Sequence, residues 1–234
     1  MKRIIKISLI LLLVGMAVIA AVPFFKEKRT ERKYENEFKN IQESVTEKKS
    51  DVNGLVKKNK DCIGYVEIPG TTISYPVMQT KDKPDFYLNH DFNRNYGFYG
   101  TPYLSAYCDV KKSDNLIIYG HNINGGKMFG ALEKYKDKEF FNKHRKIYFT
   151  TDKKREYEVF AVMSVNIHKF EYWKFVMARN KEEHDEFIDK VEEHSLWRQG
   201  NKPKYGEQML MLSTCDNGKG DDWRIVLIAK CVYS

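Results

Sequence analysis

The chain has 234 residues, 42% hydrophobic and 31% charged, which is long enough to enclose one sizeable hydrophobic core. Its formal net charge is +8, but residues 1–33 alone carry eight Lys or Arg against two Glu. The rest of the chain is therefore close to neutral, which argues against nucleic-acid binding as its function.

An apolar run covers residues 7–25, and residues 1–6 form a basic flank before it. Nineteen residues are just enough to cross a hydrocarbon core of about 30 Å. We expect a single uncleaved membrane anchor, because the run continues past the small-residue sequence Val18–Ala20 as far as Phe25. A signal peptide cleaved near Val18–Ala20 is the alternative. Basic residues lie on both sides of the run, so charge alone does not orient it.

Residues 26–60 are highly charged and predict a helical spacer, or N-terminal helix, before the main domain. Four apolar residues recur there at helical spacing and share one face: Tyr34, Phe38, Ile41 and Val45. That face either lies in solvent or packs on the domain that follows. Asn53-Gly54 interrupts the pattern, and a second short helix begins at Leu55.

Strand patterns dominate residues 61–234. Apolar or alternating runs bounded by turn residues predict strands at Ile63–Ile68, Thr72–Val77, Gly100–Tyr107, Asn115–Tyr119, Ile147–Thr150, Glu156–Asn166, Met209–Leu212 and Ile225–Ala229. Helical stretches are predicted within Asp82–Asp91, at Met128–Tyr135, at Lys138–His144 and, most clearly, at Lys181–Leu196. We therefore expect a mainly β domain, a closed barrel of about eight strands with helical insertions.

The last two predicted strands carry a thiol and a cation at facing ends. The run Met209–Leu212 ends in Ser213-Thr214-Cys215, and the run Ile225–Ala229 follows Arg224 directly. A polar, glycine-bearing loop joins them, so the thiol and the guanidinium can meet at one strand edge. A fixed cation there favours a thiolate and any oxyanion that its attack creates. The alternative is a small buried Cys215 and a solvated Arg224.

A third candidate group follows the strand Asn115–Tyr119. Gly120 permits a turn at the end of this strand, so His121 can project from the rim, where an acid or a base is needed. The alternative is a structural histidine. His121 lies 94 residues before Cys215, so only the fold can bring the two together.

The other cysteines, Cys62, Cys108 and Cys231, lie in or beside strand runs and are expected to be buried thiols. We expect Cys215 to be unpaired, because a disulfide would remove the nucleophile. No C-x-x-C zinc pattern and no glycine-rich phosphate loop is present, so neither a metal nor an organic cofactor is expected.

The segments around Cys215, Arg224 and His121 together resemble the sortases, the cysteine transpeptidases of Gram-positive cell surfaces. The family motif T-L-x-T-C corresponds to Met211–Cys215, with Met211 in place of the first Thr, and an Arg at the start of the last strand and an upstream His are also present. The resemblance covers roughly residues 55–234. A helical segment before the barrel and a long helix before the cysteine strand are similar to class B sortases.

The resemblance implies a reaction. Cys215 would attack a backbone carbonyl, His121 would donate a proton to the leaving amine and then deprotonate the incoming one, and Arg224 would stabilise the oxyanion. The substrate would be a secreted protein with a C-terminal sorting signal of the N-P-x-T-N or P-x-T-G type. The acceptor would be an amine of a peptidoglycan precursor or stem peptide, outside the cell membrane. Neither a cofactor nor a metal is implied.

Six further residues are candidates for substrate binding by the same resemblance: Ser213, Thr214, Asp216, Leu88, Tyr172 and Trp173. Ordinary packing is the alternative for Tyr172 and Trp173. Two other functional classes stay open. One is an extracytoplasmic cysteine protease or L,D-transpeptidase, although the S-H-G-C pattern of the latter is absent. The other is a non-catalytic, membrane-tethered binding domain.

Overall fold

A computed structural model describes residues 2–47 and 52–233, which divide into two compact units, residues 1–43 and 44–234. The first unit contains most of helix α1 (Lys2–Glu47), which includes the predicted apolar run and much of the charged spacer. The apolar face predicted for this spacer lies mostly on side chains outside the described residues. Among the residues that the structure describes, no helix combines the length and the hydropathy that crossing a membrane requires.

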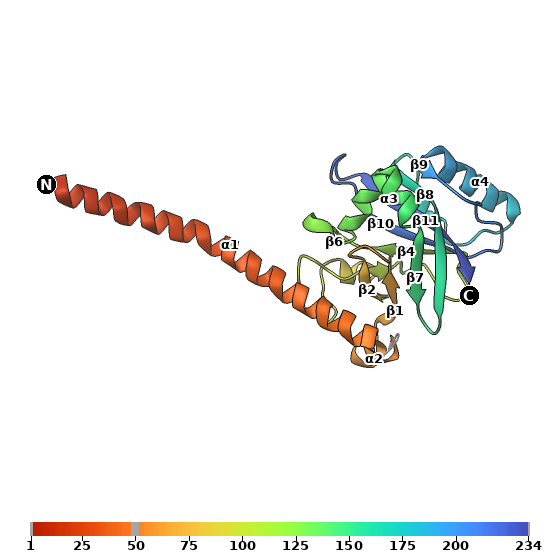
Figure 1. Cartoon of the computed structure of the whole chain (residues 1–234), viewed down its shortest axis with the longest axis horizontal. Coiled ribbons are helices and arrows are strands. Elements are labelled where there is room, and N and C mark those ends of the chain that lie inside the picture. Colours follow the sequence, from red (N-terminus) through yellow and green to blue (C-terminus); the bar gives the residue numbers. More distant parts are fainter. Residues whose placement is uncertain (1, 48–51, 234) are drawn as a thin grey trace. The chain divides into compact units, whose positions relative to one another are not determined.

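The second unit is mainly β. Its main sheet contains β1 (Cys62–Glu67), β2 (Ser74–Met78), β3 (Tyr103–Leu104), β4 (Asn115–Tyr119), β7 (Lys146–Thr150), β8 (Lys154–Asn166), β9 (Ser195–Arg198), β10 (Met209–Cys215) and β11 (Trp223–Tyr233). The strand order is β11-β10-β4-β3-β2-β1-β7-β8-β9, and β11 also pairs with β8. Eight strands therefore close into a barrel, with β9 added outside on β8 (Figure 1). This arrangement confirms the predicted fold class.

Helices and a small hairpin precede or connect these strands. They are α2 (Val52–Lys58), η1 (Phe86–Leu88), β5 (Asn122–Ile123), η2 (Asn124–Gly126), β6 (Lys127–Met128), η3 (Gly130–Lys136), α3 (Lys138–Lys143), η4 (Tyr172–Lys174) and α4 (Lys181–Glu193). Asn180 caps α4 by accepting a hydrogen bond from the Glu183 amide at 2.9 Å. The long helix predicted before the cysteine strand is therefore present as α4.

The core explains why the last two strands show unbroken apolar runs instead of alternation. From Met209 to Leu212 and from Ile225 to Ala229, every residue is fully buried. One face of these strands fills the barrel, and the other is covered by neighbouring segments, so neither face needs polar side chains. Full burial of each large apolar side chain contributes about 1.5–3 kcal/mol to stability. The ends of β10 and β11 are thereby held on a rigid support.

Four predicted elements differ from the structure. The second short helix, predicted to begin at Leu55, begins at Val52 and runs through Asn53-Gly54 as α2. The strand predicted at Gly100–Tyr107 is reduced to β3, because a turn closes after it with the Cys108 amide bonded to the Ser105 carbonyl. The helix predicted at Met128–Tyr135 begins instead at Gly130, after the β5–β6 hairpin. The helix predicted to reach Leu196 ends at Glu193, because the following residues pair with β8 as β9.

Gly100 fixes the loop that carries η1, and it yields the first prediction. Its φ is +59°, and a Cβ placed there would overlap the Leu88 carbonyl oxygen and lie 2.6 Å from the Tyr87 carbonyl oxygen. We expect Gly100→Ala to lower the free energy of unfolding by about 1–3 kcal/mol, measured by chemical denaturation. Gly125→Ala is the matched control, because Gly125 has a φ of +76° but open space around its Cβ position. Equal losses in the two variants would contradict the steric argument.

Candidate active site

The parallel pairing of β4 with β10 brings two distant segments to one edge of the barrel. The ladder runs in register from Met209 opposite Asn115 to Ser213 opposite Tyr119. Two further bonds extend the contact, from the Gly120 amide to the Ser213 carbonyl at 3.1 Å and from Thr214 Oγ1 to the Gly120 carbonyl at 2.7 Å. Because parallel strands end at the same edge, Cys215 at the end of β10 and His121, two residues after β4, share one rim.

The antiparallel pairing of β10 with β11 places the third group. Cys215 is paired directly with Arg224 in this ladder. Arg224 Nη1 donates to the carbonyl oxygen of Asp221 and, at 2.9 Å, to that of Trp223. These bonds orient the guanidinium and leave Nε and Nη2 for other acceptors. The structure therefore brings together the thiol, the cation and the imidazole that the sequence singled out.

The His121 ring is held by two contacts. Its Nε2 lies 2.8 Å from the Leu88 carbonyl oxygen, which can only accept, so Nε2 carries a hydrogen and Nδ1 is the ring nitrogen left for proton transfer. The Phe98 ring stacks on the imidazole with 5.9 Å between centroids and 12° between planes. Burial lowers the pKa of His121, and the Leu88 hydrogen bond opposes this shift.

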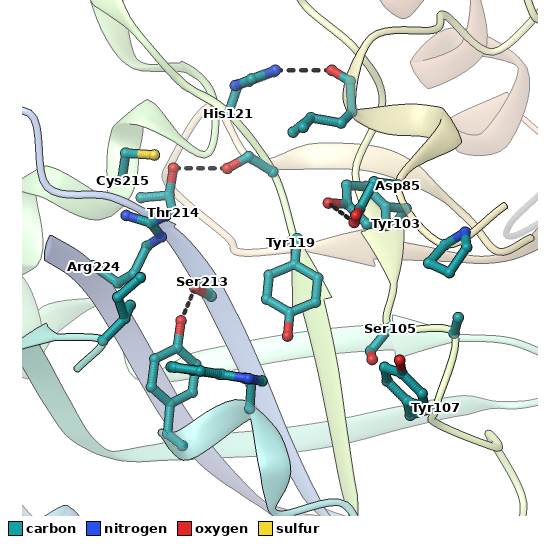
Figure 2. Close-up of a pocket in the computed structure, with 17 residues that line it drawn as sticks. Asp85, Tyr103, Ser105, Tyr107, Tyr119, His121, Ser213, Thr214, Cys215 and Arg224 are labelled. Atoms are coloured by element: carbon teal, nitrogen blue, oxygen red, sulfur yellow. Dashed lines mark hydrogen bonds between the residues drawn. The ribbon is translucent and has the colours of Figure 1, made fainter. Parts of the chain in front are cut away.

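A cleft of about 570 Å³ joins these groups (Figure 2). Its lining includes Cys215, His121 and Arg224, together with five of the six candidate substrate-binding residues: Leu88, Tyr172, Trp173, Ser213 and Thr214. Tyr172 and Ser213 are both buried, and their hydroxyl oxygens lie 2.6 Å apart. Figure 2 shows Ser213 and Thr214 on the wall that carries Arg224.

Asp216 is the candidate that the structure places elsewhere. Its carboxylate is fully buried and is absent from the cleft lining. It accepts hydrogen bonds from Lys136 Nζ and from Ser164 Oγ, both at 2.6 Å. Burial favours the neutral carboxylic acid, but these two hydrogen bonds outweigh it and hold the Asp216 pKa below its usual range. In this structure the Asp216 side chain is therefore part of the protein interior and does not line the cleft.

The far part of the cleft contains residues that the sequence analysis did not single out: Asp85, Tyr103, Ser105, Tyr107 and Tyr119. The Tyr103 hydroxyl donates to Asp85 at 3.0 Å, and Figure 2 shows both on the side opposite Cys215. Tyr119 was predictable as the last residue of a strand that leads to the site. Tyr103 lies on the short strand β3, and Asp85, Ser105 and Tyr107 lie on connecting segments, whose sequence carries no sign of the cleft.

The remaining thiols differ from Cys215 in their surroundings. None of the four cysteines forms a disulfide; Cys62 and Cys108 are buried as expected, whereas Cys231 is only half-buried, as is Cys215. Cys231 lies near the end of β11, where the barrel no longer covers it fully. Among the described residues, no group of three or more His, Cys, Asp or Glu side chains is arranged to hold a metal ion.

Comparisons with known proteins agree with this geometry. The Sortase domain family model matches residues 66–232. Sortase B of Staphylococcus aureus is 28% identical over 242 residues, covering 99% of this chain and 98% of that protein. Sortase B of Listeria monocytogenes is 32% identical over 193 residues, covering 80% and 76% of the two chains.

Solved structures give the same result. Sortase B of Clostridium perfringens is similar with a TM-score of 0.72 and 30% identity, covering 77% of this chain and 98% of its own. The substrate complex of S. aureus sortase B has a TM-score of 0.78 at 27% identity, covering 89% and 99%.

The barrel, the cleft and the family match define the class of protein: this chain belongs to the sortase family. Its relatives and structural neighbours are sortase B enzymes, so within the family it is a class B sortase, a cysteine transpeptidase of cell-wall protein sorting.

The His121 environment yields the second prediction. Because burial lowers the pKa, we expect the ring to titrate with a midpoint below the ordinary value of about 6.5 in an NMR pH titration. The folded state binds this proton more weakly than the unfolded chain, so stability falls as the pH is lowered from about 6.5 towards the folded-state pKa. His121→Gln identifies the resonance. A midpoint at or above about 6.5 would contradict the burial argument.

The four thiols yield the third prediction. Burial raises the pKa of Cys62 to about 12 and also raises that of Cys108, which suppresses the reactive thiolate at neutral pH. We expect iodoacetamide to label Cys215 first, followed by half-buried Cys231, with Cys62 and Cys108 labelled only on unfolding. Peptide mass spectrometry of timed samples measures the order. Faster labelling of Cys231 than of Cys215 would remove the argument for a reactive thiol in the cleft.

Proposed function

We propose that this sortase cleaves a C-terminal sorting signal of the N-P-x-T-N or P-x-T-G type after its Thr, and transfers the protein to a peptidoglycan amine. The observation that carries the proposal is the direct pairing of Cys215 with Arg224 in the cleft that also contains His121. Thiol, fixed cation and imidazole are the three groups that acyl transfer through a thioester requires.

The reaction follows from these positions. The Cys215 thiolate attacks the carbonyl carbon of Thr in the signal, and the guanidinium of Arg224 donates hydrogen bonds to the resulting oxyanion. Imidazolium His121 gives a proton from Nδ1 to the leaving amine as the C–N bond breaks, which leaves a thioester on Cys215. Neutral His121 then takes a proton from the incoming amine as that amine attacks the thioester. A new amide bond forms and the thiolate is restored.

The cleft suits an extended peptide with a proline and a threonine. Leu88, Trp173 and Ala106 supply apolar surface for the proline ring, and the hydroxyl-bearing residues Ser213 and Thr214 line the same cleft directly before Cys215 in the chain, where the threonine must lie. The similar S. aureus enzyme was solved as a substrate complex, and another structure is of sortase B complexed with triglycine. These relatives support a peptide substrate and an amine acceptor for this cleft.

The apolar run at residues 7–25 is proposed as a single membrane anchor, with the barrel on the extracellular face of a Gram-positive-type cell. The run's length supports an anchor, and the similarity to sortase B enzymes supports the placement on the cell surface. Fractionation of cells that make the full chain, with residues 2–26 deleted in a control, measures the anchoring. Release into the medium of a shortened protein, cleaved near Val18–Ala20, would favour a signal peptide instead.

The fourth prediction tests the reaction with soluble residues 27–234 and a panel of peptides ending in T-N or T-G. We expect intact mass spectrometry to show a thioester adduct that an added triglycine discharges to the ligated product. Cys215→Ala should give no adduct, whereas the matched control Cys231→Ala should behave as wild type. Adducts discharged only by water would favour a protease, and no adduct with any peptide would favour a binding domain.

The fifth prediction concerns the cation. Arg224→Lys keeps the charge but loses the planar set of N–H donors, so we expect kcat/KM to fall at least about 100-fold, the scale of losing an oxyanion donor. Arg179→Lys is the control, because Arg179 is highly exposed and pairs only with Glu183 in the described structure. A near-normal rate for Arg224→Lys would remove hydrogen bonding by Arg224 from the mechanism.

A further inference from the structure

The contact between the two reacting segments needs support beyond the sheet. The β4–β10 ladder ends at the Tyr119–Ser213 pair, and His121 and Cys215 each lie two residues past it. Past that pair no further bonds of this ladder fix the two segments against each other, although Cys215 is still paired with Arg224 on β11. Their separation must nevertheless stay constant, because proton transfer and thiol attack act on one scissile bond.

A closed ring of hydrogen bonds supplies this support. Asn122, which follows His121, donates from Nδ2 to the Cys215 carbonyl oxygen at 2.7 Å and to Glu133 Oε1 at 2.8 Å. Glu133 Oε2 lies 2.6 Å from Lys136 Nζ, and Lys136 reaches Asp216 Oδ1 at 2.6 Å. Asp216 follows Cys215 in the chain, so the ring returns to its starting point.

Lys136 is the hub of this ring, because it joins the two carboxylates. Glu133 holds the His121 side through Asn122, and Asp216 holds the Cys215 side. Burial lowers the pKa of the Lys136 ammonium, but the hydrogen bonds to Asp216 and Glu133 outweigh burial and raise it, so the cation is present at neutral pH. One charge therefore stabilises both carboxylates at once.

The ring is anchored to the barrel at two places. Ser164 on β8 donates to Asp216 Oδ2 at 2.6 Å. The indole Nε1 of Trp197, on the extra strand β9, donates to the Lys136 carbonyl oxygen at 3.0 Å. These bonds attach η3 and the end of β10 to the rigid part of the sheet. The ring therefore holds the Cys215 and His121 segments at fixed positions relative to the barrel.

We propose that Lys136 and Asp216 are positioning residues that hold the Cys215 segment against the His121–Asn122 segment through this ring. The proposal rests on the proposed transpeptidase function. Neither side chain belongs to the cleft lining, and Asp216 is fully buried, so the two residues act on the reaction only through the neighbours of Cys215 and His121.

The experiment measures kcat and KM for peptide ligation to triglycine in Lys136→Met, Asp216→Asn and the double variant. We expect each single variant to lower kcat about 10- to 100-fold, the scale of a misplacement of about 1 Å, while KM changes less than about 2-fold. The double variant should be no slower than the slower single variant, because both break the same ring. Its paired neutral side chains also avoid leaving one buried charge alone.

Two further variants provide the controls. Lys136→Arg keeps the cation and should recover most of the lost kcat. Lys146→Met removes a lysine that pairs with Glu156 at 3.0 Å on β7 and β8, away from the ring, and should leave kcat unchanged. A rise in KM at constant kcat would show a substrate contact, and a lower melting temperature with unchanged kcat would show a purely structural role. Either result would overturn the proposal.

Hydrogen exchange separates this proposal from the proposed function. In folded Lys136→Met or Asp216→Asn protein, we expect the amides of residues 120–122 and 215–217 to lose protection while the rest of the barrel keeps it. This measurement needs no substrate, so it still decides on the ring if wild type forms no adduct with any peptide. Unchanged protection at these two segments would overturn the proposal that the ring holds them together, whatever substrate the enzyme uses.

Discussion

The parallel pairing of β4 with β10 is the constraint on which the site depends. Two parallel neighbours point their carboxyl ends at one edge, so His121 and Cys215 meet although 94 residues separate them in the sequence. The chain between them must cross over, and that crossover contains further elements of the site, namely η3 with Lys136, η4 with Tyr172 and β9 with Trp197. The antiparallel return through β11 then adds Arg224 opposite the thiol. Closure of the barrel through the β8–β11 pairing makes this edge rigid.

Beyond the sheet, the site is organised by paired charges. Each of them, buried without its partner, would destabilise the fold. The fully buried Asp216 carboxylate lies next to the nucleophile in the chain, and losing its partner would cost about 3–5 kcal/mol. Lys136 and Ser164 satisfy it, so the cost of burial is offset where the Cys215 segment must be held still. Asp216 was predicted from the sequence to contact substrate. Its position in the interior suits instead the positioning role proposed for it above.

How much of this was readable from the sequence depends on the range of the interaction. The apolar runs beside Cys215, Arg224 and His121 are local patterns, and they correctly placed each group at a strand end. Strand order is a long-range property, so the meeting of His121 with Cys215 came only from the resemblance to the sortases. Strand β9 was missed because its pairing with β8 overrides a pattern that extends α4 by a few residues. Lys136, in a short 3₁₀ helix, carries no local sign that it lies half-buried against two carboxylates. Polar residues on connecting segments are therefore where the fold adds most to the sequence.

The backbone at the tip of β10 bears on how the proposed oxyanion is stabilised. The Asp216 amide donates to the Trp223 carbonyl oxygen at 2.9 Å, which continues the β10–β11 ladder one step past Cys215. That amide is therefore engaged in the sheet, whereas Nε and Nη2 of Arg224 stay available beside the thiol. In the proposed reaction the Arg224 guanidinium then supplies the hydrogen bonds to the oxyanion of the substrate. A planar, always charged donor suits this task, because it needs no reorganisation when the negative charge develops.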